Sequence, residues 1–142
     1  IMDLSDNNIT IIDSLSIKNL YEKPIRLKNL SLNRNNLRLI EYNSLLRNLI
    51  HLENFDLSQN KLVSLENDTF QTMFKLKYLN LSYNYLETIN PYIFKKSQNL
   101  FILDLSQNRL RLVEKLAFQY FDLLSELYLS SSDDIELKSQ VE

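Results

Sequence analysis

The stretch NLFILDLSQNRLRLVEKLAFQYF, residues 99–121, contains a motif, LDLSQN, that the chain repeats. The motif returns as FDLSQN at 55–60 and as LNLSYN at 79–84. Its asparagine belongs to a series with separations of 28, 25, 24 and 24 residues: Asn7, Asn35, Asn60, Asn84 and Asn108. Apolar residues recur at fixed offsets around each asparagine, with neither helical nor strand periodicity over a full unit. Such a period is typical of a stacked coil with one short strand per turn.

The residue types indicate how such a coil is held together. In LDLSQN the two leucines point inward from the strand, and the residue between them points outward. The asparagine follows at a bend, where its amide can bond to backbone groups that would otherwise be buried without partners. Phe70, Phe94 and Phe118 are expected to fill the thicker, outer half of each coil. We therefore expect an elongated solenoid with parallel strands near residues 2–4, 30–32, 55–57, 79–81, 103–105 and 127–129.

These residues resemble the leucine-rich repeat superfamily. The 24-residue unit, with phenylalanine at its nineteenth position, is similar to the "typical" subclass of ectodomains such as Toll and Toll-like receptors, Slit-type guidance proteins and matrix proteoglycans. The resemblance implies an α/β-type, right-handed curved solenoid whose parallel strands line the concave face. It covers residues 1–132 as an array of about six coils, and it leaves residues 133–142 as a polar C-terminal tail.

The chain departs from the family pattern at several points. Extra residues near YEKPIR, residues 21–26, are expected to form a bulged loop on the convex side or flank. Leu45 replaces the expected phenylalanine, and Asp134 stands where leucine is due. The family usually closes its arrays with cysteine-bearing caps, and this chain contains no cysteine. It therefore looks like an interior segment of a longer ectodomain, whose uncapped ends are expected to expose core leucines and to self-associate.

The composition argues against nucleic-acid binding and membrane contact. The 142 residues include 16 basic and 18 acidic side chains, and their formal charge of −2 favours neither nucleic acid nor an anionic membrane. The longest apolar runs last only a few residues, so we expect no transmembrane helix and no signal peptide in this segment.

The residues that catalysis needs are scarce. His51 is the single histidine and is predicted to be a surface residue at the edge of a coil. The absence of glycine argues against a phosphate-cradling loop of the usual kind. Asp3, Asp56 and Asp104 fall in one outward column but in alternate coils, about 10 Å apart, which is too far to share a cation. We therefore predict no catalysis, no metal site and no cofactor.

Outward positions on the strands and just past them carry the candidate binding residues. A column of serines that includes Ser58 and Ser82 is expected to keep a strip of the concave face open to a partner. Large side chains gather over the last coils, and tyrosine and arginine most often anchor protein interfaces. The candidates are Tyr78, Tyr83, Tyr85, Ile102, Arg109 and Tyr128, with Arg34 and Lys61 in the same columns. Alternatively, tyrosine, present in eight copies, simply packs on its neighbours along an exposed sheet.

N-x-S/T sequons begin at Asn8, Asn29, Asn67 and Asn80 and favour a glycosylated, extracellular protein. Alternatively, about two of them arise by chance from the abundant asparagines, and NLS is partly a by-product of the repeat. Asn67, in a loop before Phe70, is the strongest candidate acceptor. Asn80 points from a concave strand, where a glycan would block part of the candidate surface.

Two classes of function remain open. By implication of the resemblance, the chain is a recognition segment of an extracellular receptor or secreted protein, with a protein or glycan ligand on its concave face. Innate recognition is one such role, and adhesion and guidance are others. The alternative is a passive solenoid spacer whose contacts lie elsewhere in a longer chain. The clustered aromatic and charged residues of the last coils favour recognition, whereas the interchangeable polar residues of the first coils are typical of a spacer.

Overall fold

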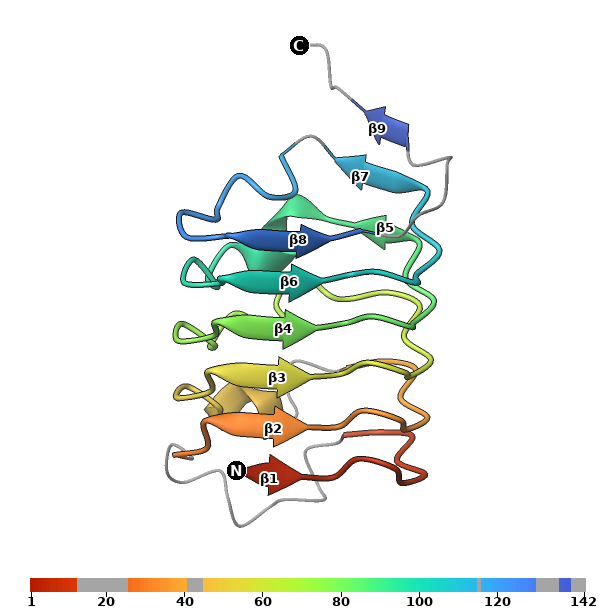
Figure 1. The fold of residues 1–142 in the computed structure, drawn as a ribbon, viewed down its shortest axis with the longest axis vertical. Coiled ribbons are helices and arrows are strands. Elements are labelled where there is room, and N and C mark those ends of the chain that lie inside the picture. The colour runs from red at the N-terminus through yellow and green to blue at the C-terminus, as the bar shows by residue number, and fades with distance from the viewer. Residues whose placement is uncertain (13–25, 41–44, 115, 130–135, 139–142) are drawn as a thin grey trace.

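The computed structural model describes residues 1–12, 26–40, 45–114, 116–129 and 136–138. The chain coils along one axis, and successive coils add strands to a six-stranded parallel sheet (Figure 1). In order, the strands of this sheet are β1 Met2–Asp3, β2 Asn29–Ser31, β3 Asn54–Asp56, β4 Tyr78–Asn80, β6 Ile102–Asp104 and β8 Glu126–Tyr128. The predicted solenoid of parallel strands is confirmed.

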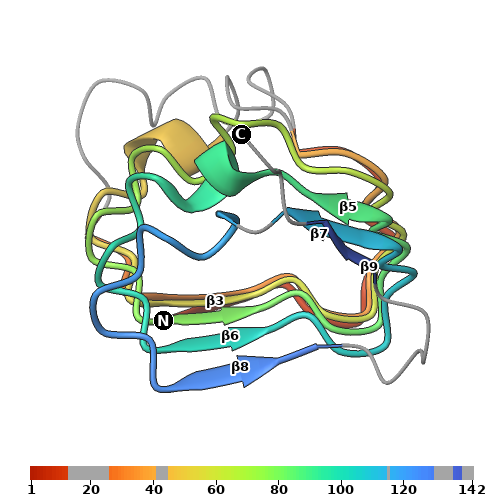
Figure 2. The ribbon, with the colours of Figure 1, turned by 90° about the horizontal axis from the view of Figure 1, so that it is seen from above.

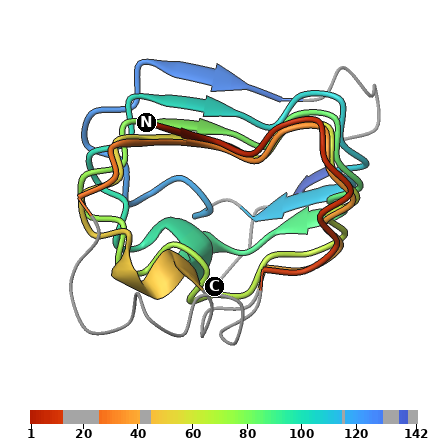
Figure 3. The same ribbon diagram turned by 90° about the horizontal axis from the view of Figure 1, so that it is seen from below.

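The opposite side of the coil carries shorter elements (Figures 2 and 3). A three-stranded parallel sheet contains β5 Thr88–Ile89, β7 Leu112–Glu114 and β9 Glu136–Lys138. Two 3₁₀ helices lie on the same side, η2 Leu45–Asn48 and η3 Pro91–Phe94. Most of the loop expected at 21–26, and the position of Asp134, lie outside the described residues.

The strands after β1 begin one residue earlier than the sequence predicts. The backbone N–H of Asn54 already donates to the carbonyl of Lys28 at 2.9 Å, and that of Tyr78 to the carbonyl of Glu53 at 3.0 Å. Pairing therefore starts at the residue before the first inward apolar side chain. As a result, the residues that open these strands belong to the sheet itself: Asn29, Asn54, Tyr78, Ile102 and Glu126.

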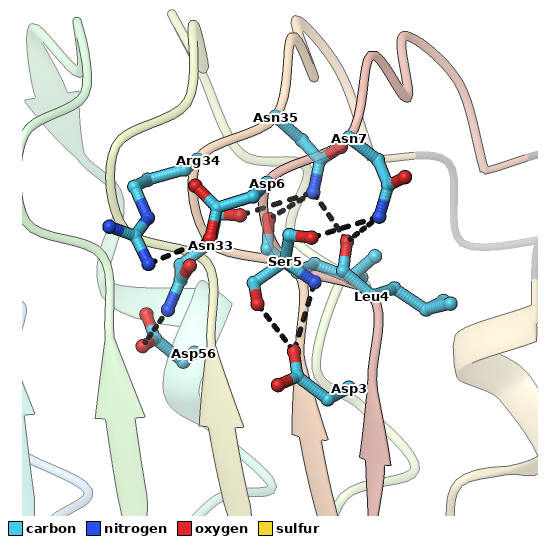
Figure 4. Close-up of polar contacts among 10 residues, drawn as sticks. Asp3, Leu4, Ser5, Asp6, Asn7, Asn33, Arg34, Asn35 and Asp56 are labelled. Atoms are coloured by element: carbon cyan, nitrogen blue, oxygen red, sulfur yellow. Dashed lines mark hydrogen bonds and ion pairs between the residues drawn. The ribbon is translucent and has the colours of Figure 1, made fainter.

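Asparagine side chains join each coil to the coil before it. Asn60 Nδ2 donates to the carbonyl of Leu57 in its own coil at 3.1 Å and to that of Leu32, one coil earlier, at 2.9 Å. Its Oδ1 accepts the backbone N–H of Leu37, also one coil earlier, at 3.0 Å. The same pattern is found at Asn35 (Figure 4), Asn84 and Asn108. The predicted asparagine ladder is confirmed.

The residue before each bend asparagine, Asn7 included, has a left-handed backbone conformation. The angle φ lies between 52° and 57° at Asp6, Arg34, Gln59, Tyr83 and Gln107. This conformation costs a non-glycine residue about 1–2 kcal/mol. The chain has no glycine to relieve that cost. The bend turns the asparagine amide toward the core, where its hydrogen bonds offset the backbone strain.

Aromatic rings form a row through the core behind the six-stranded sheet. Phe70 stacks on Phe94 with ring centroids 6.0 Å apart, and it meets Phe55 edge-on at 6.5 Å. The next ring after Phe94 is Phe121 at 5.3 Å, and Phe118 stacks on Phe121 at 6.1 Å. The predicted burial of Phe70 and Phe94 is confirmed. Phe118 is only partly buried and joins the row through Phe121, which is also partly buried.

We expect Asn84→Ala to lower the free energy of unfolding by about 1–3 kcal/mol, because it leaves the buried carbonyl of Leu57 and N–H of Leu62 without their amide partner. Urea unfolding followed by circular dichroism measures the change. The exposed Asn67→Ala should stay within about 0.5 kcal/mol of the wild type. Equal urea midpoints for the two variants would contradict the role of the ladder.

Candidate functional site

The concave face of the six-stranded sheet contains an open hollow of about 390 Å³. Ile1 and Met2 line its N-terminal end. Its aromatic side chains come from the C-terminal strands, where Tyr78 on β4 pairs in register with Ile102 on β6, and Asp104 with Tyr128 on β8. Three carboxylates line it, those of Asp3, Asp56 and Asp104. None of the described residues that line it is a lysine or an arginine. The hollow is therefore negatively charged, with aromatic side chains toward its C-terminal end.

Hydrogen bonds at the strand ends hold the aspartates in place. Asp3 Oδ1 accepts the hydroxyl and backbone N–H of Ser5 at 2.6 and 3.0 Å (Figure 4), and these bonds lower the pKa of Asp3 below its ordinary value. Asp56 accepts the N–H of Ser58 at 2.9 Å in the same way. The same hydrogen-bonded turn at Asn80 and Ser82 holds the serine in an inward position, so Ser58 and Ser82 are buried. The predicted serine strip is therefore closed at Ser58 and Ser82, whereas Ser5 and Ser106 are only half-buried.

Tyr128 stands at the C-terminal end of the hollow. Its hydroxyl donates a hydrogen bond to the carboxylate of Glu126. This bond, with a smaller effect of Asp104, raises the pKa of Tyr128 above its ordinary value. The phenol therefore stays neutral and adds aromatic surface next to acidic groups.

Tyr83 lies at the bend, and Tyr85 and Arg109 lie just past it. We call this surface the post-strand flank, and none of the three residues lines the concave hollow. The guanidinium carbon of Arg109 lies 4.3 Å from the ring centroid of Tyr85, in a cation–π contact. Tyr83 is 58% exposed. The predicted binding residues therefore form two groups, one in the hollow and one on this flank.

Arg34 and Lys61 lie on the N-terminal part of the same flank. Arg34 forms an ion pair with Asp6 at 2.7 Å (Figure 4), so its charge is largely compensated. Lys61 lines a separate hollow of about 540 Å³ with Arg38 and Leu39. Neither residue belongs to the concave hollow.

The sequons divide between the concave face and the rest of the surface. Asn8 and Asn67 are exposed. Asn29 and Asn80 line the concave hollow, and the side-chain oxygen of Asn29 accepts a hydrogen bond from Asn54. A glycan on Asn8 or Asn67 would leave the hollow free, whereas one on Asn29 or Asn80 would occupy it.

The described part of the chain lacks a metal-binding cluster, a histidine in the concave hollow and a membrane-spanning helix. Within them, no group of three or more His, Cys, Asp or Glu side chains is placed to hold a metal ion. His51 Nδ1 lies 3.4 Å from Lys75 Nζ, and neither residue lines the concave hollow. The helical segments of this part of the chain lack the length and apolar character that crossing a bilayer requires.

The positions one and three residues before each strand form a third surface, the pre-strand flank, which the sequence analysis missed. On the earlier coils it carries ion pairs, from Lys28 to Glu53 at 2.8 Å and from Lys77 to Glu53 at 2.9 Å. On the next coils the same positions carry Phe101 and Leu123. The recurrence of alternating charges directly before the strands could have identified this surface.

Hydrogen bonds from Lys28 and Lys77 lower the pKa of Glu53 from 4.5 to about 2. Because the folded-state pKa lies below the unfolded one, the stabilisation is present above about pH 4.5 and is lost as the pH falls toward 2. Thermal unfolding of the wild type and Glu53→Gln should therefore give a stability gap that shrinks over this range. The gap should be modest, because both lysines are largely exposed.

The exposed Glu66→Gln is the control, and its gap from the wild type should change less with pH than that of Glu53→Gln. A gap for Glu53→Gln that is constant between about pH 5 and pH 2 would contradict the ion-pair account.

Known proteins share this architecture. The family described as leucine rich repeat matches residues 25–86, 50–96 and 75–134. No curated protein sequence matches the chain significantly. The structure of the Toll–Spatzle complex of Drosophila aligns with a TM-score of 0.72 and 34% identity over 75% of this chain, and its glycosylated form with 0.69 and 35% over 72%. The TLR13–ssRNA13 complex aligns with a TM-score of 0.79 and 30% identity over 90%.

The chain spans 14% of the matched chain in each Toll–Spatzle structure and 17% of that in the TLR13 structure. Within this span the repeat length, the asparagine ladder and the parallel sheet all agree with the family match. The chain therefore belongs to the leucine-rich repeat family, as a segment similar to the Toll and Toll-like receptor ectodomains.

Proposed function

We propose that this chain is a protein-recognition segment of an extracellular, Toll-like receptor, and that its partner lies along the concave face. The observation that carries the proposal is the concave hollow, which combines the carboxylates of Asp3, Asp56 and Asp104 with the rings of Tyr78 and Tyr128. Tyrosine rings supply a large contact area and lose little rotamer entropy on binding. The carboxylates favour a partner with exposed lysine or arginine side chains.

A protein partner fits this chemistry better than RNA does. The two kinds of neighbouring structure contain Spatzle in one case and ssRNA13 in the other. Proteins bind the nucleic-acid backbone mainly through lysine and arginine. The described residues that line the hollow include neither, and three aspartates there would repel phosphates. The Toll–Spatzle structure is described as a hub of Drosophila development and innate immunity, and a role in innate recognition belongs to the same proposal.

The post-strand flank gives the partner a second place of contact. The ring of Tyr85 already holds the guanidinium of Arg109, so less side-chain entropy is lost when that cation binds a carboxylate of the partner. Tyr83, exposed in the same coil as Tyr85, adds apolar area. A partner that wraps from the hollow around the bend would contact both groups.

The test uses a lysine-rich extended peptide as the probe and the double variant Asp56→Asn and Asp104→Asn. Asparagine keeps the side-chain oxygen that accepts the N–H of Ser58 and Ser106, so these turns are retained while the charge is lost. The bond that Asp56 Oδ2 accepts from Asn33 Nδ2 is lost with the charge. We expect the peptide to bind the double variant about fivefold or more weakly than the wild type, measured by calorimetry at physiological salt.

The control is the double variant Glu66→Gln and Asp68→Asn, which changes the net charge equally at exposed positions outside the hollow. It should keep wild-type affinity. Equal weakening in both double variants would contradict concave binding, and so would saturable binding of a single-stranded RNA oligonucleotide in place of the peptide.

The extracellular part of the proposal predicts where glycans attach. When the chain is secreted from eukaryotic cells, we expect glycopeptide mass spectrometry to find glycans at Asn67 or Asn8, both exposed outside the hollow. Asn67→Gln should remove the first of these without changing binding of the lysine-rich probe. High occupancy at both Asn29 and Asn80 would fill the hollow and contradict recognition through it.

A further inference from the structure

The pre-strand flank contains an open apolar hollow that adjoins the concave hollow at Tyr78, which lines both. Tyr78, Phe101 and Leu123 line it, with Glu53, Lys75, Lys77 and Asn99, and its volume is about 500 Å³. Its residues belong mainly to the turns that precede β4, β6 and β8, and these turns are on the left in Figure 1. Phe101 is 41% and Leu123 57% exposed. Large apolar side chains grouped in this way mark an interaction site more often than single exposed ones do.

The hollow is already formed in the isolated chain. The ring of Phe101 meets that of Tyr78 edge-on, with centroids 6.3 Å apart. The N–H of Phe101 donates to the carbonyl of Lys77 at 2.8 Å, and the N–H of Ser125 donates to the carbonyl of Phe101 at 2.9 Å. Asn99 Nδ2 also donates to the carbonyl of Phe74 at 2.6 Å. Because these bonds fix the walls, a ligand pays little ordering entropy when it enters.

The rim of the hollow is positively charged. Glu53 contributes one negative charge, and both of its oxygens are already paired, with Lys28 and Lys77. Lys75 has no carboxylate partner among the described residues, and its Nζ faces His51 Nδ1 at 3.4 Å. Among the charged residues that line the hollow, Lys75 and Lys77 against Glu53 leave one excess positive charge, on Lys75, next to the apolar floor.

We propose that this hollow docks an acidic protein segment that inserts one large apolar side chain between Phe101 and Leu123 and places a carboxylate beside it near Lys75. The apolar floor excludes water around the inserted side chain, and the excess of lysine selects the charge of its neighbours. The site shares Tyr78 with the concave hollow but otherwise lies on a different flank, and it selects the opposite charge. The segment therefore offers adjacent surfaces to two protein segments of opposite charge.

The test uses the full chain and a short capped peptide with phenylalanine flanked by aspartates. Nuclear magnetic resonance titration should show saturable shifts of the backbone amides of Phe101, Leu123 and Lys75. The double variant Phe101→Ala and Leu123→Ala should bind at least about fivefold more weakly. Lys75→Gln should weaken binding of this peptide but not of one in which serine replaces the aspartates. Each of these results supports the proposal.

Val63→Ala removes an exposed apolar side chain outside this hollow, and Lys95→Gln removes a lysine outside it, so both are matched controls. Both should bind the peptide as the wild type does. Equal binding by the Phe101 and Leu123 double variant would overturn the proposal, as would tighter binding of a peptide with lysines in place of the aspartates. Self-association of the chain that the same double variant abolishes would assign the hollow to a second copy and overturn it too.

Discussion

The buried asparagine amide is the interaction on which the rest of this structure depends. Each amide in the ladder bonds to two coils at once, so it fixes both the bend within a coil and the spacing to the previous one. The left-handed residue before it costs about 1–2 kcal/mol. Leaving the buried groups unpaired would cost about 1–3 kcal/mol for each group. Several groups are paired for each strained residue. The free energy of these hydrogen bonds therefore exceeds the cost of the strained backbone, and the bend needs no glycine.

Because the ladder holds successive coils in register, side chains at equivalent positions form straight columns. Within a column, side chains of neighbouring coils are about 5 Å apart. The three surfaces around the sheet therefore differ in chemistry for reasons of sequence alone. The concave face collects carboxylates and tyrosines, the post-strand flank collects cations, and the pre-strand flank changes from paired charges to apolar side chains. One rigid backbone can thus present surfaces of opposite charge preference within a few coils, which is what the two proposed binding sites require.

The repeat predicted the fold because inward leucines and bend asparagines recur at a fixed spacing, and packing leaves few alternatives for them. The predicted start of the strands after β1 was one residue too late, because backbone pairing already begins at the residue before the first inward side chain, such as Asn54. The burial of Ser58 could not be predicted from its polarity, because it follows from a hydrogen bond to Asp56. Phe101 and Leu123 were missed since they lie outside the leucine pattern, and only the register of neighbouring coils brings them together with Tyr78.

Hydrogen exchange of the asparagine side chains tests the ladder most directly. In a nitrogen-15 labelled sample, the Nδ2 protons of Asn60, Asn84 and Asn35 should exchange slowly, with protection close to that of the core backbone amides. The exposed side chain of Asn67 should exchange at the rate of a free amide. Fast exchange at all four positions, in a chain that is folded by circular dichroism, would contradict the account that these amides hold the coils together.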